Sequence, residues 1–100
     1  MGYPIDLNDI AYRQWKVCER LGWHNKTRLE CLALIASEVG EAVNEARVDP
    51  PTAFFAEELA DIILRTLDLA ETHQINIQQV VLNKLIKNEA MTCKPAGKDK

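Results

Sequence analysis

Two pairs of carboxylates in this chain have the spacing of neighbouring side chains on a helix. Glu38 and Glu41 form the first pair, and Glu58 and Asp61 form the second. A separation of three positions places both members of a pair on one side of a helix, one turn apart. Four converging carboxylates repel one another unless water or a cation neutralises them. Because Mg²⁺ prefers oxygen ligands, the pairs predict a magnesium site, with Mn²⁺ as the substitute ion.

The segments that must position these pairs have a helical pattern throughout, and no alternating run predicts a strand. Helices are expected over residues 9–21, 28–47, 53–73 and 76–90. Their start and stop signals are Gly22 after the first helix, a Thr27–Glu30 capping box, Thr52 as the third N-cap, and a box formed by Asn76 and Gln79. The fold class is therefore all-α, with a bundle-like arrangement of four helices.

Composition limits the domain organisation and the partners. The chain has 100 residues, of which 47% are hydrophobic. We expect one domain over residues 1–91 and a basic, flexible tail over residues 92–100. A domain of this size has a thin core, so oligomerisation is a natural expectation. The net charge of −3 argues against binding to a nucleic-acid polymer. Neither a signal peptide nor a membrane-spanning run is evident, so we expect a cytoplasmic protein without a membrane partner.

The predicted second and third helices carry their carboxylates beside apolar residues rather than on a purely polar side. In the second helix the main apolar stripe comprises Leu32, Ile35, Ala36, Val39, Val43 and Ala46, while Cys31, Leu34 and Ala42 are interleaved with the glutamates. A short connection makes the two helices antiparallel, so their acidic sides can face each other across a groove. No histidine has the Glu-x-x-His spacing of a di-iron site, which favours Mg²⁺ or Mn²⁺.

Three ordered motifs resemble a known family. Residues 37–42 read SEVGEA, residues 57–63 read EELADII, and Lys84 and Asn88 follow four positions apart. This order resembles the all-α nucleoside triphosphate pyrophosphohydrolases of the MazG type, which carry ExxE, then ExxD, then a lysine and an asparagine in the last helix. The resemblance runs from about residue 29 to residue 88.

The resemblance implies a helical protomer that assembles as a homodimer or homotetramer. It implies Mg²⁺-dependent hydrolysis of a (deoxy)nucleoside triphosphate to a monophosphate and pyrophosphate, in clearance of unwanted nucleotides. The implied metal ligands are Glu38, Glu41, Glu58 and Asp61. Lys84 and Asn88 would contact the substrate. Either Glu38 or Glu41 would accept the proton of the attacking water, and the motif leaves the choice between them open.

Aromatic residues before the second helix are candidates for holding a nucleobase by stacking. They are Tyr12, Trp15, Trp23 and His24, of which the last three are the chosen substrate-binding candidates. Trp15 has the helical spacing of a core residue, whereas Trp23 and His24 occupy a turn. The chain also departs from the family after Asn88, because the arginine-rich run of many relatives is replaced by residues 89–93, EAMTC.

Two other functions fit the same residues. A related enzyme, such as a dUTP diphosphatase or a phosphoribosyl-ATP pyrophosphohydrolase, would share the carboxylates but act on a different substrate. A non-catalytic helical interaction module would carry the same acidic stripe simply as a solvated surface.

Overall fold

Four helices and their connections form the described part of the chain, which is residues 5–91 of the computed structural model. The helices are α1 (Leu7–Arg20), α2 (Arg28–Glu45), α3 (Phe55–Thr72) and α4 (Ile77–Glu89). The all-α prediction with four helices is confirmed for these residues. None of the described helices is both long enough and apolar enough to cross a membrane. The predicted tail, residues 92–100, lies outside the described residues.

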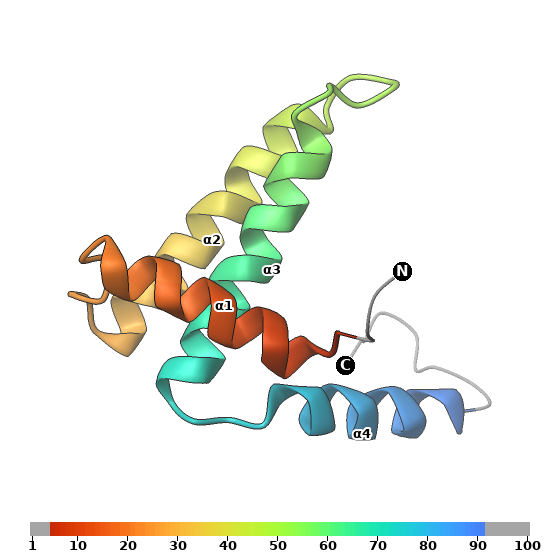
Figure 1. The fold of residues 1–100 in the computed structure, drawn as a ribbon. Helices are drawn as coiled ribbons and strands as arrows, with labels where there is room; N and C mark the ends of the chain where they lie inside the picture. The colour runs from red at the N-terminus through yellow and green to blue at the C-terminus, as the bar shows by residue number, and fades with distance from the viewer. Residues whose placement is uncertain (1–4, 92–100) are drawn as a thin grey trace.

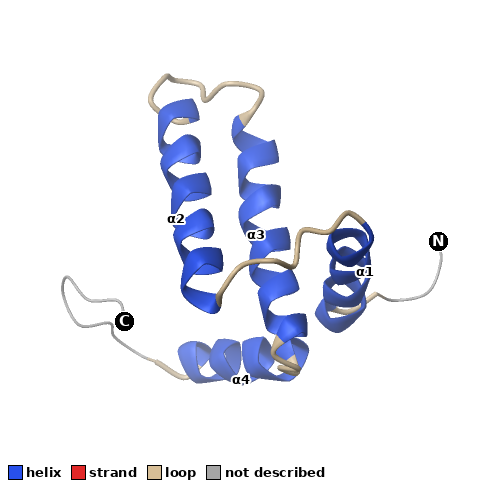
Figure 2. Ribbon diagram, turned by 90° about the vertical axis from the view of Figure 1, so that its left-hand side faces the viewer, coloured by secondary structure: helices blue, strands red, loops and turns tan. Residues whose placement is uncertain are grey.

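The helices are arranged around an antiparallel hairpin formed by α2 and α3 (Figure 2). Helix α1 crosses α3 near the end of the hairpin opposite the α2–α3 connection, and α4 runs across that same end (Figure 1). Within residues 5–91, α4 contacts α1 and α3 but not α2. The amide of Leu7 donates to Gln78 Oε1 at 2.9 Å, and the amide of Gln78 donates to Asn8 Oδ1 at 3.1 Å. The first turns of α1 and α4 are therefore joined.

Local capping explains where the first two helices begin. The predicted box at α2 is confirmed, because the Glu30 amide donates to Thr27 Oγ1 at 3.1 Å and the Thr27 amide donates to Glu30 Oε1 at 2.8 Å. A second box, between Asp6 and Asp9, begins α1 at Leu7. The prediction that this helix begins after Asn8 was therefore wrong by two residues. Both boxes satisfy amide groups that have no partner within the helix.

The predicted caps of α3 and α4 differ from the observed ones. Helix α3 begins at Phe55 without a side-chain cap, so the prediction of Thr52 as its N-cap was wrong. The Thr52 hydroxyl donates to the Glu45 carboxylate at the end of α2 and accepts from the Phe54 amide at 3.2 Å, in the turn before the helix. At α4, Asn76 accepts from the Gln79 amide, but the Gln79 side chain donates to Asn83 rather than completing the predicted box. The first difference reflects a turn over residues 53–54 that delays α3, and the second reflects a side-chain partner outside the local motif.

Gly22 ends α1 with a left-handed turn. Its φ is +74°, and its amide donates to the Glu19 carbonyl at 3.2 Å, while the Trp23 amide donates to the Cys18 carbonyl at 2.8 Å. These two bonds form a Schellman motif, which satisfies the last carbonyls of a helix and turns the chain sharply. The turn brings His24 back towards the hairpin. The predicted stop at Gly22 is confirmed.

The buried core of the described protomer is small. It comprises Ala11, Cys18, Ala42, Leu67 and Ala70. Helix α1 packs on the part of the α3 apolar stripe that contains Leu67, which is 4% exposed, whereas Ile63 on the same stripe is 54% exposed. On α2 the main apolar stripe faces outward, and Val43 is 51% exposed. Helix α2 therefore packs on α3 through its mixed acidic and apolar side.

We expect Gly22→Ala to lower the free energy of unfolding by about 1 kcal/mol, because a side chain is strained at positive φ. Gly40 is a matched control inside α2, where an added Cβ meets nothing within 4 Å. Gly40→Ala should raise the free energy of unfolding by about 0.5–1 kcal/mol, since alanine favours the helix. Urea denaturation followed by circular dichroism measures both. Equal effects of the two substitutions would contradict the Schellman assignment.

Candidate metal centre

Three of the four predicted ligands converge where α2 and α3 pack together. Glu38 from α2 and Glu58 and Asp61 from α3 each offer an oxygen, and these atoms lie within 4.8 Å of one another. Such separations suit a single bound cation with carboxylate ligands. Glu41, the fourth predicted ligand, is exposed and stands outside this group. The antiparallel hairpin thus brings the two motifs together, as the pattern predicted.

The Glu58 carboxyl lacks a neutralising partner. Its Oε1 atom is buried and has no hydrogen-bond partner among the described residues. Burial raises the pKa of Glu58, and both hydrogen bonding to the adjacent Glu38 carboxyl and the negative charges of Glu41, Glu38 and Asp61 raise it further. An unpaired acceptor beside three other negative charges is the environment that a divalent cation would relieve. The residues present therefore fit a hard cation held by Glu38, Glu58 and Asp61.

Arg65 supplies a positive charge that the sequence reasoning did not single out. Its Nε donates to Glu38 Oε2 at 3.1 Å, across the α2–α3 groove. Arg65 follows Asp61 by four positions, so the two residues share one side of α3. That spacing was the available signal, but an isolated arginine on a helix usually indicates a solvated residue.

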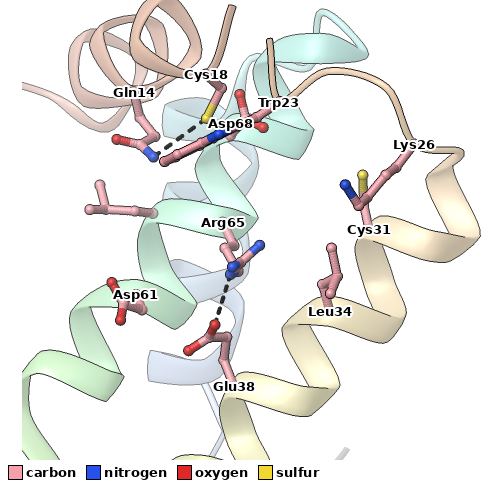
Figure 3. A pocket seen from close by; sticks show the side chains of 11 residues that line it. Gln14, Cys18, Trp23, Lys26, Cys31, Leu34, Glu38, Asp61, Arg65 and Asp68 are labelled. Carbon is pink, nitrogen blue, oxygen red and sulfur yellow. Dashed lines mark hydrogen bonds and ion pairs between the residues drawn. The ribbon is translucent and has the colours of Figure 1, made fainter. Parts of the chain in front are cut away.

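A cavity of about 480 Å³ extends from this carboxylate group between α1, α2 and α3, a volume typical of small-molecule sites. Figure 3 shows Glu38 and Asp61 at one end and Gln14, Cys18, Trp23 and Asp68 at the other, with Arg65 between them. Lys26, Cys31, Leu34 and Leu64 complete the wall. The cavity therefore joins an acidic end, suited to a cation, to an end with polar and aromatic side chains.

The predicted substrate-binding residues lie in three different places. Trp23 lines the cavity. Trp15 and His24 pack against each other, with ring centroids 5.2 Å apart, and are not part of the cavity lining. Lys84 and Asn88 lie on α4, which does not contact α2, and neither lines the cavity. Within residues 5–91 of one protomer, the predicted lysine–asparagine element is therefore separate from the carboxylates.

His24 joins α1 to α3 through two ion pairs. Its Nδ1 lies 2.7 Å from Glu19 Oε1, and its Nε2 lies 2.8 Å from Asp68 Oδ1. Burial lowers the pKa of His24, but hydrogen bonds and charge from Glu19 and Asp68 outweigh it, so the pKa is raised. A ring that donates from both nitrogens is an imidazolium. His24 thus fastens the turn after α1 to the hairpin.

Cys18, His24 and Asp68 form a second group with the composition of a metal site, but their chemistry does not fit one. A metal-bound histidine needs a neutral nitrogen, and both His24 nitrogens face carboxylates. Burial raises the pKa of the Cys18 thiol, and the charge of Asp68 raises it further, so the reactive thiolate is disfavoured. This group is an ion-pair clamp beside a protonated thiol.

Comparison of the chain with protein-family models, curated proteins and solved structures found no match. The geometry of the carboxylate group and of the adjoining cavity is therefore the main support for a functional proposal.

We expect Glu58→Gln to raise the melting temperature in the absence of divalent ions, because it removes a buried charge that faces other carboxylates. Adding 10 mM Mg²⁺ to the native chain should contribute about 1.4 kcal/mol if Kd is near 1 mM. That is an increase in melting temperature of roughly 5–10 °C, which Glu58→Gln should abolish. Differential scanning calorimetry with and without Mg²⁺ measures both effects.

Glu57→Gln is the matched control for this measurement, because Glu57 is the exposed neighbour of Glu58 and lies outside the converging group. It should leave both melting temperatures close to those of the native chain. A Mg²⁺-dependent rise that persists in Glu58→Gln would rule out Glu58 as a ligand.

The His24 ion pairs predict a pH dependence of stability. Because the folded-state pKa is raised, their contribution is complete below the unfolded value of about 6.5 and is lost as pH rises through the folded pKa. His24→Gln should cost about 1 kcal/mol at pH 6, the scale of a partly solvated ion pair, and clearly less at pH 9. Urea denaturation across this range measures the difference. His73→Gln, at the exposed end of α3, should leave the profile unchanged, whereas an equal loss at both pH values in His24→Gln would argue against the clamp.

Proposed function

We propose that this protein is a Mg²⁺-dependent pyrophosphohydrolase that cleaves (deoxy)nucleoside triphosphates to monophosphates and pyrophosphate, as a means of removing unwanted nucleotides. The observation that carries the proposal is the convergence of Glu38, Glu58 and Asp61 around an unpartnered Glu58 oxygen. The cavity that begins at this group has a volume suited to a small molecule. The order of the ExxE and ExxD motifs in the chain, which resembles that of the MazG-type enzymes, supports the same function.

The residues of this chain divide the chemistry among them. Glu38, Glu58 and Asp61 would hold Mg²⁺, which when bound supplies charge neutralisation and Lewis acidity at the phosphates. Glu41 stands one turn from Glu38 and outside the converging group, so its carboxylate is free to accept the proton of the attacking water. Water forms the new P–O bond at the α-phosphorus, and the bond to the oxygen that leaves with pyrophosphate breaks.

Arg65 would contribute positive charge on the phosphate side. It lines the cavity between the carboxylates and the polar end, and it already pairs with Glu38. If Glu38 holds Mg²⁺, the Arg65 guanidinium would be available to the phosphate, whose oxygens it can bind with two parallel donors. Arg65 would thereby supply part of the positive charge that the arginine-rich run after the asparagine provides in many MazG-type relatives and that is absent after Asn88 in this chain.

We also propose that the protein acts as a homo-oligomer, either a dimer or a tetramer. Among residues 5–91, the buried core contains one large aliphatic side chain, that of Leu67, and a core of this size gives little stability to a protomer. Exposed apolar side chains follow the outer faces of the hairpin, and none of the residues of α4 is buried. In such an assembly, Lys84 and Asn88 of one protomer would lie near the carboxylates of the other.

The activity is tested by measuring pyrophosphate release from a panel of canonical and modified nucleoside triphosphates with Mg²⁺ or Mn²⁺. Glu38→Gln and Asp61→Asn should each lower kcat at least a hundredfold while leaving the helical circular dichroism signal intact, since each removes a proposed ligand. Glu57→Gln should retain activity. Chromatography of the products should show the monophosphate and pyrophosphate.

Other outcomes of this assay would replace the proposal. Release of orthophosphate would indicate cleavage at a different bond. Activity confined to dUTP, or to phosphoribosyl-ATP, would favour the corresponding related enzyme. Absence of turnover together with absence of Mg²⁺ binding would leave a helical interaction module.

The oligomer is tested with a pair of adjacent substitutions on α2. Val43 lies on the exposed apolar stripe, whereas Asn44 is exposed on the polar side. Val43→Arg should reduce the mass measured by light scattering to that of a single protomer and lower activity, because it places a charge in an apolar interface. Asn44→Arg should change neither. A native chain that is monomeric at micromolar concentration would contradict the proposal.

A further inference from the structure

Asp68 occupies the end of the cavity opposite the carboxylate group. It lies on the same side of α3 as Asp61 and Arg65, because the spacings of four and three residues keep all three on one face. Seven residues of helix separate Asp61 from Asp68 by about 10 Å along the axis. That separation is comparable to the span from the phosphates of a nucleotide to the far edge of its base. A nucleotide with its phosphates at Glu38 and Asp61 would therefore extend its base towards Asp68 (Figure 3).

The Asp68 carboxylate is held in a fixed orientation. His24 Nε2 donates to its Oδ1 at 2.8 Å, and the Asp68 side chain is 16% exposed. A carboxylate that accepts from the His24 imidazolium has no proton to donate, so it can only accept hydrogen bonds. Asp68 also lines the cavity, beside the Cys18 thiol. Its two carboxylate oxygens have lone pairs beyond the one that accepts from His24, so Asp68 can accept a further hydrogen bond from a ligand.

The groups around Asp68 suit a flat, polar ring. Trp23 lines this end and is 57% exposed, so the face of its indole ring is available for stacking. Leu34, Leu64 and Cys31 supply apolar wall. The Gln14 amide nitrogen donates to Cys18 Sγ at 3.5 Å. Asp68 is the residue at this end that offers a charged acceptor.

On the basis of the proposed function, we propose that Asp68 is a specificity-determining residue that selects triphosphates whose nucleobase carries an exocyclic amino group. An amino group donates to the carboxylate, whereas a carbonyl at the same ring position would place two acceptors together and leave Asp68 unpaired. A binding site built to accept a hydrogen bond discriminates strongly against a ligand without the donor. Cytosine and adenine carry the amino group at the position where uracil and hypoxanthine carry a carbonyl.

The experiment compares matched nucleotides, dCTP with dUTP and dATP with dITP, by kcat/KM for pyrophosphate release. The native protein is expected to hydrolyse one of the two pairs faster than the other. In that pair, kcat/KM for the amino nucleotide should be at least ten times kcat/KM for its carbonyl partner. Asp68→Asn presents an amide that can donate as well as accept, so this ratio should fall to within about threefold, mainly through KM. An unchanged ratio in Asp68→Asn, or a native ratio near one, would overturn the role of Asp68.

Glu19→Gln is the matched control, because Glu19 pairs with the other nitrogen of His24 but does not line the cavity. It should lower stability while leaving the base preference unchanged. A loss of preference in Glu19→Gln equal to that in Asp68→Asn would assign the effect to the clamp and overturn a direct contact.

A binding measurement keeps the inference testable if Asp68→Asn does not fold. Quenching of the tryptophan fluorescence of a Trp15→Phe chain, in which Trp23 is the remaining tryptophan, by dCMP and dUMP and by dAMP and dIMP should show at least tenfold tighter binding of an amino nucleotide than of its carbonyl partner. Equal binding of the amino and carbonyl nucleotides in both pairs would overturn the role of Asp68. If the protein nevertheless hydrolyses triphosphates, the proposed function stands. A native protein that neither hydrolyses any triphosphate nor binds Mg²⁺ would remove both.

Discussion

The packing of α2 on α3 through their acidic sides is the constraint on which the other features depend. Two helices of this length would ordinarily pack through their most apolar stripes. In this hairpin the contact between the acidic sides instead brings Glu38 close to Glu58 and Asp61. The small residue Ala42 is buried on the same side and allows the helices to approach. Repulsion among the carboxylates opposes the contact, and the Arg65–Glu38 ion pair offsets only part of it. The hairpin is thus less stable than one closed through apolar side chains alone would be.

Helix α1 compensates for this on the other side of α3. It covers the part of the apolar stripe that contains Leu67, and the left-handed turn at Gly22 returns the chain so that His24 reaches Asp68. The same clamp that holds α1 in place also forms one end of the cavity. Asp68 therefore serves both the packing of α1 on α3 and the lining of the cavity.

The sequence predicted the helices and the converging carboxylates, because both follow from local spacing. Capping was predicted correctly at Thr27, where the partner is three residues away, and wrongly at Thr52, where a turn over residues 53–54 delays the start of the helix to Phe55. The buried side of α2 was ambiguous, because both of its sides carry apolar residues. Arg65 and Asp68 gave no distinct signal. A single charged residue on a helix has the same pattern whether it faces solvent or a cavity, and only the placement of α1 distinguishes the two.

The separation of α1 from α2 determines what fixes the width of the cavity. Both helices contribute walls to the cavity, yet no Cα atoms of the two lie within 8 Å of each other, and each packs on α3 independently. Only the connection over residues 21–27 links them directly. A change in the distance between these two walls therefore requires α1 or α2 to shift on α3, and the His24–Asp68 ion pair opposes such a shift of α1. Helix α3 is thus the common reference for both walls, and the width of the cavity depends on two separate helix–helix contacts rather than on one.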